Sequence, residues 1–249
     1  MKDISEVSLE YIDKEIEAAR NDYFEEERLQ TVDSKPRLVF KYKSITSAKD
    51  LARVCDIFTR QRIYMPTVEQ LNDPLESRNS ILLGIDESER NEKLKNSHVL
   101  SLSADPLLPT MWAYYADNYK GLCIGFKTTD AFSSIEKVEY VGKQKGICWD
   151  TDFAVSADIN TKSVAWQHEN EYRIVRKSSE HLTFNSADVA CVLFGCRMEE
   201  EIRNHIEAVI PKSIPRFTVK PDETKFCLFA DAETRVYNVE QLAKILDAK

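Results

Sequence analysis

The prediction of the fold of this 249-residue chain starts from Trp166-Gln167-His168-Glu169-Asn170-Glu171-Tyr172-Arg173, followed by Ile174-Val175-Arg176. We predict a β-strand over residues 169–175, in which successive side chains point to opposite faces. Glu169, Glu171 and Arg173 then share one face, with neighbours about 7 Å apart at a rise of roughly 3.3 Å per residue. Two carboxylates and a guanidinium behind a tryptophan indicate a polar cleft. The alternative is a solvated strand face held by cross-strand ion pairs.

The composition is that of an ordinary globular protein, with 43% hydrophobic and 31% charged residues. No run approaches the roughly 20 apolar residues of a membrane helix, and the acidic N-terminus lacks the apolar core of a secretory signal. We therefore expect a cytoplasmic location and no membrane partner. A formal net charge of −8 argues against non-specific binding to phosphate backbones. It still permits a local basic pocket for a nucleotide, built from Lys41, Lys43, Arg60 and Arg62.

The six cysteines are scattered through apolar contexts, and none forms a CxxC pair. We interpret them as reduced core residues of a cytoplasmic protein. Cys191, Cys196, His205 and Cys227 are spaced more loosely than the usual zinc patterns, so we predict no metal.

Hydrophobic periodicity divides the chain into an N-terminal helical extension, residues 1–35, and a single α+β domain, residues 36–249. We predict helices over residues 7–29, 44–59, 87–96, 110–119, 199–209 and 239–246. Besides the strand at 169–175, we predict strands over residues 37–43, 62–65, 98–102, 122–127, 135–141, 181–184, 189–194, 214–219 and 225–229. Many short strands with interspersed helices indicate a mixed or largely antiparallel split sheet flanked by helices.

Two segments could serve either structure or function. In residues 71–76, Asp73 can cap a helix, Pro74 fits its first position and Glu76 completes a capping-box pattern, which accounts for these residues structurally. Residues 142–162 have weak periodicity and are predicted to be a loop, with room for a short helix, at the rim of a site.

Aromatic side chains are concentrated in residues 110–119, which include Trp112, Tyr114, Tyr115 and Tyr119. Such side chains either stack on a planar ligand ring or fill the core, and core packing is the commoner case.

Four segments together resemble, in this order, the bacterial family called domain of unknown function 2971. They are Phe40-Lys41-Tyr42-Lys43-Ser44; Leu71-Asn72-Asp73-Pro74-Leu75-Glu76; Trp112-Ala113-Tyr114-Tyr115-Ala116-Asp117 with Lys120-Gly121; and Trp166 with Glu169, Glu171, Tyr172 and Arg173. The resemblance covers residues 38–209 and implies family membership without an activity.

A weaker resemblance is to ADP-ribosyltransferases, in which a first strand, a helix and a second strand precede a late strand that opens with Glu-x-Glu. The resemblance implies that Glu171 is catalytic and that Glu169 orients the acceptor. It places the first-strand ligand residue at Tyr42, or at Lys41 or Lys43, and the second-strand residue at Tyr64 or just after it. This chain departs from the pattern because its first strand has no central His or Arg and no Ser-Thr-Ser signature follows.

The second resemblance implies NAD as the substrate. Cleavage of the nicotinamide–ribose bond develops positive charge on the ribose, and Glu171 would stabilise that oxocarbenium-like transition state. Glu169 would act as base or hydrogen-bond acceptor for the incoming nucleophile. The remaining expected substrate-site residues, which surround the two acids or belong to the family segments, are Lys41, Tyr42, Lys43, Tyr64, Asn72, Asp73, Glu76, Trp112, Tyr115, Trp166 and Arg173.

Three functions stay open at this stage. The first is an NAD-dependent ADP-ribosyltransferase or NAD glycohydrolase, of the bacterial defence or toxin type, acting on an unknown protein or nucleic-acid acceptor. The second is a non-catalytic nucleotide-sensing or interaction module. The third is a metal-dependent nuclease with Asp73, Glu76, Glu169 and Glu171 around magnesium. P-loop and Rossmann motifs are absent, and the sequence leaves the oligomeric state open.

Overall fold

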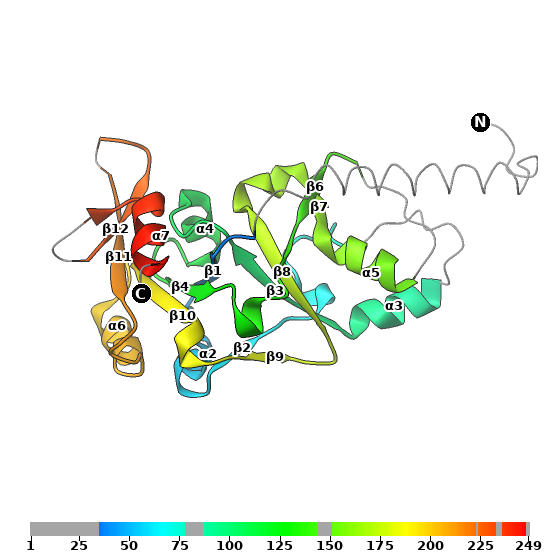
Figure 1. The fold of residues 1–249 in the computed structure, drawn as a ribbon, viewed down its shortest axis with the longest axis horizontal. Helices are drawn as coiled ribbons and strands as arrows, with labels where there is room; N and C mark the ends of the chain where they lie inside the picture. Colours follow the sequence, from blue (N-terminus) through cyan, green and yellow to red (C-terminus); the bar gives the residue numbers. More distant parts are fainter. Residues whose placement is uncertain (1–34, 78–86, 144–150, 223, 233–235, 248–249) are drawn as a thin grey trace, which may run out of the picture.

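The strand Val189–Gly195 (β10) is apolar throughout, and all seven of its residues are buried. It lies inside a nine-stranded sheet, between β4 and β11, where both of its faces are covered (Figure 1). Burial on both faces explains why this strand is continuously apolar and does not alternate. The predicted central strand is therefore confirmed, and so is the α+β fold class.

The computed structural model describes residues 35–77, 87–143, 151–222, 224–232 and 236–247. The predicted helix at residues 7–29 lies outside this part of the chain. No helix in the part described is long and apolar enough to cross a membrane.

The nine strands form a mixed sheet, in which β10 and β11 are parallel and the other neighbours are antiparallel. In spatial order they are β13 (Val236–Tyr237), β12 (Leu228–Asp231), β11 (Arg216–Pro221), β10, β4 (Leu122–Lys127), β1 (Leu38–Lys43), β3 (Ser97–Ser103), β8 (Glu171–Lys177) and β5 (Glu136–Lys137). Two short pairs lie outside the sheet: antiparallel β2 (Arg62–Tyr64) with β9 (His181–Thr183), and parallel β6 (Glu139–Val141) with β7 (Thr161–Ser163).

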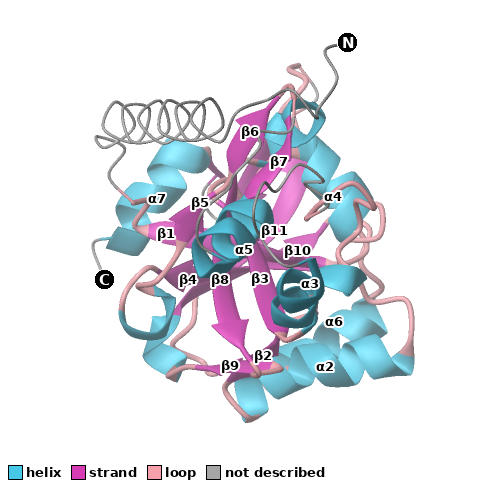
Figure 2. Cartoon of the chain, turned by 90° about the vertical axis from the view of Figure 1, so that its right-hand side faces the viewer, coloured by secondary structure: helices cyan, strands magenta, loops and turns pink. Residues whose placement is uncertain are grey.

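Helices cover both faces of the sheet. The helices α2 and α6 pack on one face and α4 and α7 on the other (Figure 1), whereas α3 and α5 lie side by side (Figure 2). The α-helices are α2 (Ala48–Thr59), α3 (Glu87–Lys95), α4 (Pro109–Tyr115), α5 (Thr151–Asn160), α6 (Glu200–Glu207) and α7 (Val239–Asp247). Short 3₁₀ helices are η2 (Val68–Gln70), η3 (Asp130–Phe132), η4 (Val164–Glu169) and η5 (Ser186–Asp188).

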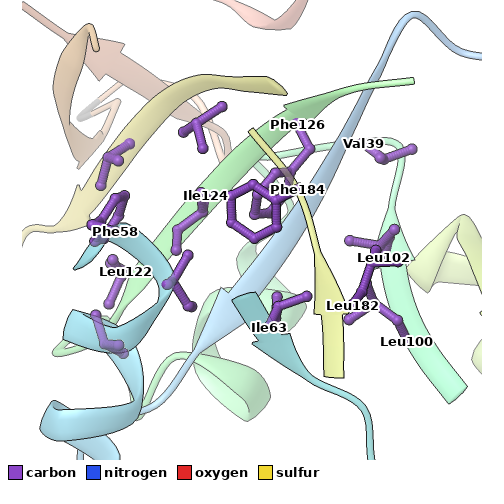
Figure 3. Close-up of a cluster of buried hydrophobic side chains, with 14 of the residues drawn as sticks. Val39, Phe58, Ile63, Leu100, Leu102, Leu122, Ile124, Phe126, Leu182 and Phe184 are labelled. Carbon is purple, nitrogen blue, oxygen red and sulfur yellow. The ribbon is translucent and has the colours of Figure 1, made fainter. Parts of the chain in front are cut away.

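The alternation of side chains along β1 assigns them to two cores. Val39 belongs to one buried cluster with Ile124 and Phe126 of β4 and with apolar side chains of α2, β2 and β9 (Figure 3). Leu38, Phe40 and Tyr42 pack on the opposite face with α4 and α7. The strand predicted at residues 37–43 is confirmed as β1, and its two faces contribute to different cores.

The sheet divides between β1 and β3. β1 pairs with β4 from Leu38 to Lys43, but it pairs with β3 only where Phe40 meets Ser103. β3 in turn pairs with β8 along its whole length, from Ser97 to Ser103. The strands β1 and β3 therefore separate away from this one pair.

The predicted strand at residues 169–175 begins two residues late. Glu169 is the last residue of η4, and Asn170 follows it in the left-handed conformation with φ 45°. Asparagine tolerates this conformation better than most residues. The chain therefore turns at Asn170 before β8 starts at Glu171, so Glu169 is not on the strand.

Three further expectations are wrong in part. Residues 74–77 form a turn, in which Asp73 Oδ1 accepts the Leu75 N–H at 2.9 Å as an N-cap does, but the Glu76 carboxylate binds Lys162 and Arg173 and does not complete a capping box. Residues 151–163 form α5 and β7, although the sequence favoured a loop. Cys196 and Cys227 are exposed, whereas Cys123 and Cys191 lie in the core as expected.

The helix predicted at residues 110–119 ends early because Asp117, Asn118 and Tyr119 all have positive φ, at 46°, 51° and 71°. This left-handed turn brings the Tyr119 carbonyl against β10. A Cβ added to Gly195 would lie only 2.0 Å from that carbonyl oxygen. Glycine is therefore required at residue 195 by close approach of the backbone.

We expect Gly195→Ala to lower the free energy of unfolding by about 2 kcal/mol or more, since neither backbone segment can move aside cheaply. Urea denaturation would measure this loss. Gly142→Ala is the matched control, because among the described residues, apart from its chain neighbours, no heavy atom lies within 4 Å of its added Cβ. Equal stabilities of the two variants would contradict the close packing of the turn on β10.

Candidate functional site

A cavity of about 160 Å³ lies where β1 and β3 separate. Phe40, Lys41 and Tyr42 line it from β1, and Ser101 and Ser103 line it from β3. Further lining side chains come from residues 66–76, from α4, and from β7, η4 and β8. The division of the sheet therefore opens a space in which strands and turns distant in sequence meet.

The cavity brings together eight of the thirteen residues that the sequence nominated for the site. These are Lys41, Tyr42, Asn72, Glu76, Tyr115, Glu169, Glu171 and Arg173. Lys43, Tyr64, Asp73, Trp112 and Trp166 do not line it. Of the lining residues that sequence reasoning did not nominate, Lys162 has the most contacts with the acids.

Lys162 stands at the centre of three carboxylates. Its Nζ lies 2.5 Å from Glu169 Oε2, 3.0 Å from Glu171 Oε2 and 3.2 Å from Glu76 Oε1. All four side chains are at most 5% exposed. The solvated strand face considered for Glu169 and Glu171 is therefore wrong, because both acids are buried and paired.

Arg173 completes the network from β8. Its Nε donates to Glu171 Oε1 at 2.8 Å, and its Nη2 donates to Glu76 Oε2 at 2.5 Å and to Glu171 Oε2 at 3.0 Å. Its Nη1 donates to the Ile159 carbonyl. All three nitrogens of this buried guanidinium therefore donate hydrogen bonds. The bond to Glu76 links the turn that carries Glu76 to β8.

The network stabilises the charged forms of Glu171 and Lys162. Burial opposes ionisation of Glu171, but the Arg173 guanidinium and then Lys162 outweigh it and lower the pKa of Glu171 to about 2. Burial likewise opposes the charge on Lys162, but Glu171, Glu76 and Glu169 raise its pKa above the ordinary value. A buried lysine and a buried carboxylate thus stabilise each other as ions.

Two tyrosines hold the acids in place. The Tyr115 hydroxyl donates to Glu169 Oε1 at 2.6 Å, and burial together with Glu169 raises the pKa of this tyrosine. The Tyr140 hydroxyl accepts the backbone N–H of Glu171 at 2.8 Å, and burial raises its pKa to about 12. Both hydroxyls therefore stay protonated at neutral pH.

Trp166 and Asp73 form a layer behind the ion network. Trp166 Nε1 donates to Asp73 Oδ2 at 2.8 Å, and Lys162 Nζ lies 5.1 Å from the centre of the indole ring. A cation at this distance from an indole is stabilised by the ring. These two residues therefore support Lys162 and do not face the cavity.

Other nominated residues serve the fold. Trp112 is fully buried, packs edge-on against Tyr42, and donates its Nε1–H to the Pro106 carbonyl at 2.8 Å. The Tyr64 hydroxyl donates to Gln70 Oε1 at 2.9 Å, and Tyr64 belongs to the separate β2–β9 pair. Of the two aromatic residues that the sequence nominated on α4, Tyr115 lines the cavity and Trp112 belongs to the core.

The basic pocket expected from four lysines and arginines is not formed. Arg60 and Arg62 both pair with Asp56 of α2, at 3.2 Å and 2.8 Å. Neither these arginines nor Lys43 line the cavity, whereas Lys41 does.

Within the described part of the chain, no group of three or more His, Cys, Asp or Glu side chains is placed to hold a metal ion. Glu76, Glu169 and Glu171 do converge, but the Lys162 ammonium lies among their oxygens. The Lys162 ammonium therefore lies where a divalent ion bound by these three carboxylates would lie.

Residues 111–174 match the model of the family described as Protein of unknown function (DUF2971). This match confirms the family resemblance. The DUF2971 segment runs from α4 to β8 and contains five polar side chains of the cavity: Tyr115, Lys162, Glu169, Glu171 and Arg173. No curated protein and no solved structure matches the chain, and the comparisons do not show the similarity to ADP-ribosyltransferases.

We expect Lys162→Met to lower the free energy of unfolding by about 3–5 kcal/mol, because it leaves three buried carboxylates short of one cation. Urea denaturation at neutral pH would measure the loss. Lys220→Met is the control, since Lys220 is half exposed and its pair with Asp231 stabilises a surface strand by at most about 1 kcal/mol. A loss no larger than that of the control would contradict the central role of Lys162.

The lowered pKa of Glu171 predicts acid sensitivity. Because ionised Glu171 is favoured in the folded state, its contribution is complete above pH 4.5 and is lost as the pH falls toward about 2. We expect the free energy of unfolding to fall by up to about 3 kcal/mol across this window from this group. Glu171→Gln should show a smaller fall in the same denaturation series, whereas Glu201→Gln, exposed on α6, should retain the wild-type profile.

Proposed function

We propose that the cavity binds a nucleotide of the NAD type and breaks its nicotinamide–ribose bond, as an NAD glycohydrolase or ADP-ribosyltransferase. The observation that carries this proposal is the pair of buried, cation-held acids, Glu169 and Glu171, on the wall of one cavity beside Tyr115. The DUF2971 family description supplies no activity, so the chemistry of these residues is the basis of the proposal.

The reaction needs a fixed negative charge beside the ribose. As the bond to nicotinamide lengthens, positive charge develops on the ribosyl ring in an oxocarbenium-like transition state. A carboxylate that is already oriented stabilises this charge without reorganisation, and burial strengthens the interaction. Lys162 and Tyr115 hold Glu169 by one hydrogen bond to each oxygen, which provides that orientation.

The contacts of the two acids support different roles. Glu171 accepts three hydrogen bonds from Lys162 and Arg173 and a further one from Ser101, which uses the roughly four acceptor positions of a carboxylate. Glu169 accepts one side-chain hydrogen bond at each oxygen from the described residues, so both oxygens can accept another. We therefore assign the contact with the ribosyl group to Glu169 and the positioning of Lys162 and Arg173 to Glu171.

This assignment differs from the one that the ADP-ribosyltransferase resemblance implies, in which Glu171 makes the catalytic contact. We assign stacking on the nicotinamide or adenine ring to Tyr115, because it is the aromatic residue of α4 that lines the cavity. Cleavage by a glycohydrolase uses water as the acceptor, whereas transfer by an ADP-ribosyltransferase needs a protein or nucleic-acid nucleophile.

A second candidate is a nucleotide-sensing module that binds without turnover. It is favoured by the balance of charge in the cavity, where Lys41, Lys162 and Arg173 offset Glu76, Glu169 and Glu171. A magnesium-dependent nuclease has less support, because the Asp73 carboxylate is engaged by Trp166 and Leu75, and Lys162 lies among the other three acids.

We expect incubation of the full chain with NAD to release nicotinamide, and Glu169→Gln to slow the release by about 100-fold or more. The loss follows because glutamine keeps the shape of the side chain but not the charge that faces the ribosyl cation. Chromatography of the products separates free ADP-ribose, which indicates hydrolysis, from ADP-ribose attached to an acceptor.

Glu201→Gln on the exposed face of α6 is the matched control and should release nicotinamide at the wild-type rate. Melting temperatures of all variants, with and without NAD, separate catalysis from binding and from loss of the fold. Stabilisation by NAD without nicotinamide release would favour the sensing module, and release unchanged in Glu169→Gln would remove this acid from the mechanism.

A further inference from the structure

Lys41 differs from the other two cations of the cavity. Lys162 and Arg173 each pair with two or more carboxylates. None of the ion pairs within the described part of the chain involves Lys41, whose Nζ donates one hydrogen bond, to the Ser101 carbonyl at 2.8 Å. Its amine therefore has capacity left for a group that enters the cavity.

The surroundings of Lys41 make its ammonium form less stable than that of an ordinary lysine. Burial where β1 and β3 separate disfavours the ammonium form, and Lys43, two residues along the same face of β1, repels it further. Together they lower the pKa of Lys41 to about 8. Desolvation beside a second cation is a known means of making a lysine nucleophilic.

The other charged groups near Lys41 act in both directions. The charged side chains that face it across the cavity are Glu169 of η4, Glu171 of β8 and Arg173 of β8. The two acids favour the ammonium and Arg173 opposes it, and burial with Lys43 outweighs the acids. Cys123 of β4 also interacts electrostatically with Lys41. Burial raises the pKa of its thiol well above the ordinary value, so Cys123 stays neutral.

We infer that Lys41 is a nucleophilic amine that captures a small carbonyl compound in the cavity as an imine. The amine nitrogen attacks the carbonyl carbon, the C=O bond is replaced by C=N, and the oxygen leaves as water with the two amine protons. No oxidant or metal is required. A cavity of about 160 Å³ limits the ligand to a small aldehyde or ketone, or to the carbonyl end of a larger molecule.

The test uses glycolaldehyde with sodium cyanoborohydride, which reduces an imine to a stable amine, followed by peptide mass spectrometry of the full chain. At pH 7.5 we expect Lys41 to be labelled at least about tenfold faster than exposed Lys212 and Lys225, because an ordinary lysine has a pKa near 10.4 and is almost wholly protonated. The labelling rate of Lys41 should rise with pH to a midpoint near 8.

Lys43→Met supplies the matched variant, since it removes the neighbouring cation but keeps Lys41. Its midpoint should move to higher pH, and its labelling at pH 7.5 should slow by several fold. Lys41 labelled no faster than Lys212 and Lys225 in the folded wild-type protein would overturn the inference. So would a midpoint that is unchanged in Lys43→Met, because the arrangement on β1 would then have no effect on the amine.

This inference stands apart from the proposed cleavage of NAD. Labelling of Lys41 needs no nucleotide, and nicotinamide release needs no aldehyde. Selective labelling without nicotinamide release would therefore support the amine chemistry alone, and the reverse result would support the NAD proposal alone.

Discussion

The contact on which this structure depends most is the Lys162 ammonium held among the carboxylates of Glu76, Glu169 and Glu171. Charges taken out of water are costly unless they are paired and fully hydrogen-bonded. The network pairs each of these charges by drawing together the turn that carries Glu76, the end of η4, the start of β8 and β7. Arg173 then fixes the same turn to the sheet. The walls of the cavity are thus positioned by charge pairing where the hydrophobic cores do not reach.

The hydrophobic cores supply the rigid frame for that network. Apolar side chains cover both faces of β10, β4 and β1, so the centre of the sheet cannot shift without loss of packing. Beyond the Phe40–Ser103 pair, the backbone of β1 no longer pairs with that of β3, and the cavity lies between the two strands. The position of Lys41, next to a gap in the sheet and between two cores, follows directly from this geometry.

Local patterns predicted what depends on neighbours in sequence. The apolar character of residues 189–194 and 37–43 identified both strands, and the Glu169, Glu171 and Arg173 pattern pointed to three residues that line the cavity. Lys162 was missed because its partner Glu76 is far away in sequence and its own segment has weak periodicity. Trp112 and Tyr115 share one short helix, so only packing decides which ring enters the core. The turn at Asn170 was also missed, since asparagine permits a left-handed conformation without requiring it.

The distribution of unused hydrogen-bonding capacity separates a binding site from a structural ion network. A network that serves stability alone gains from complete pairing, because each unpaired buried group costs free energy. Arg173 and Glu171 fit that description, since their donors and acceptors are taken up within the protein. Glu169 and Lys41 line the same cavity with capacity to spare, one as an acceptor and the other as a donor or nucleophile. A ligand that presents a donor to Glu169 and an electrophilic or anionic group to Lys41 would complete the pairing, which is the physical reason for proposing that this cavity binds a ligand.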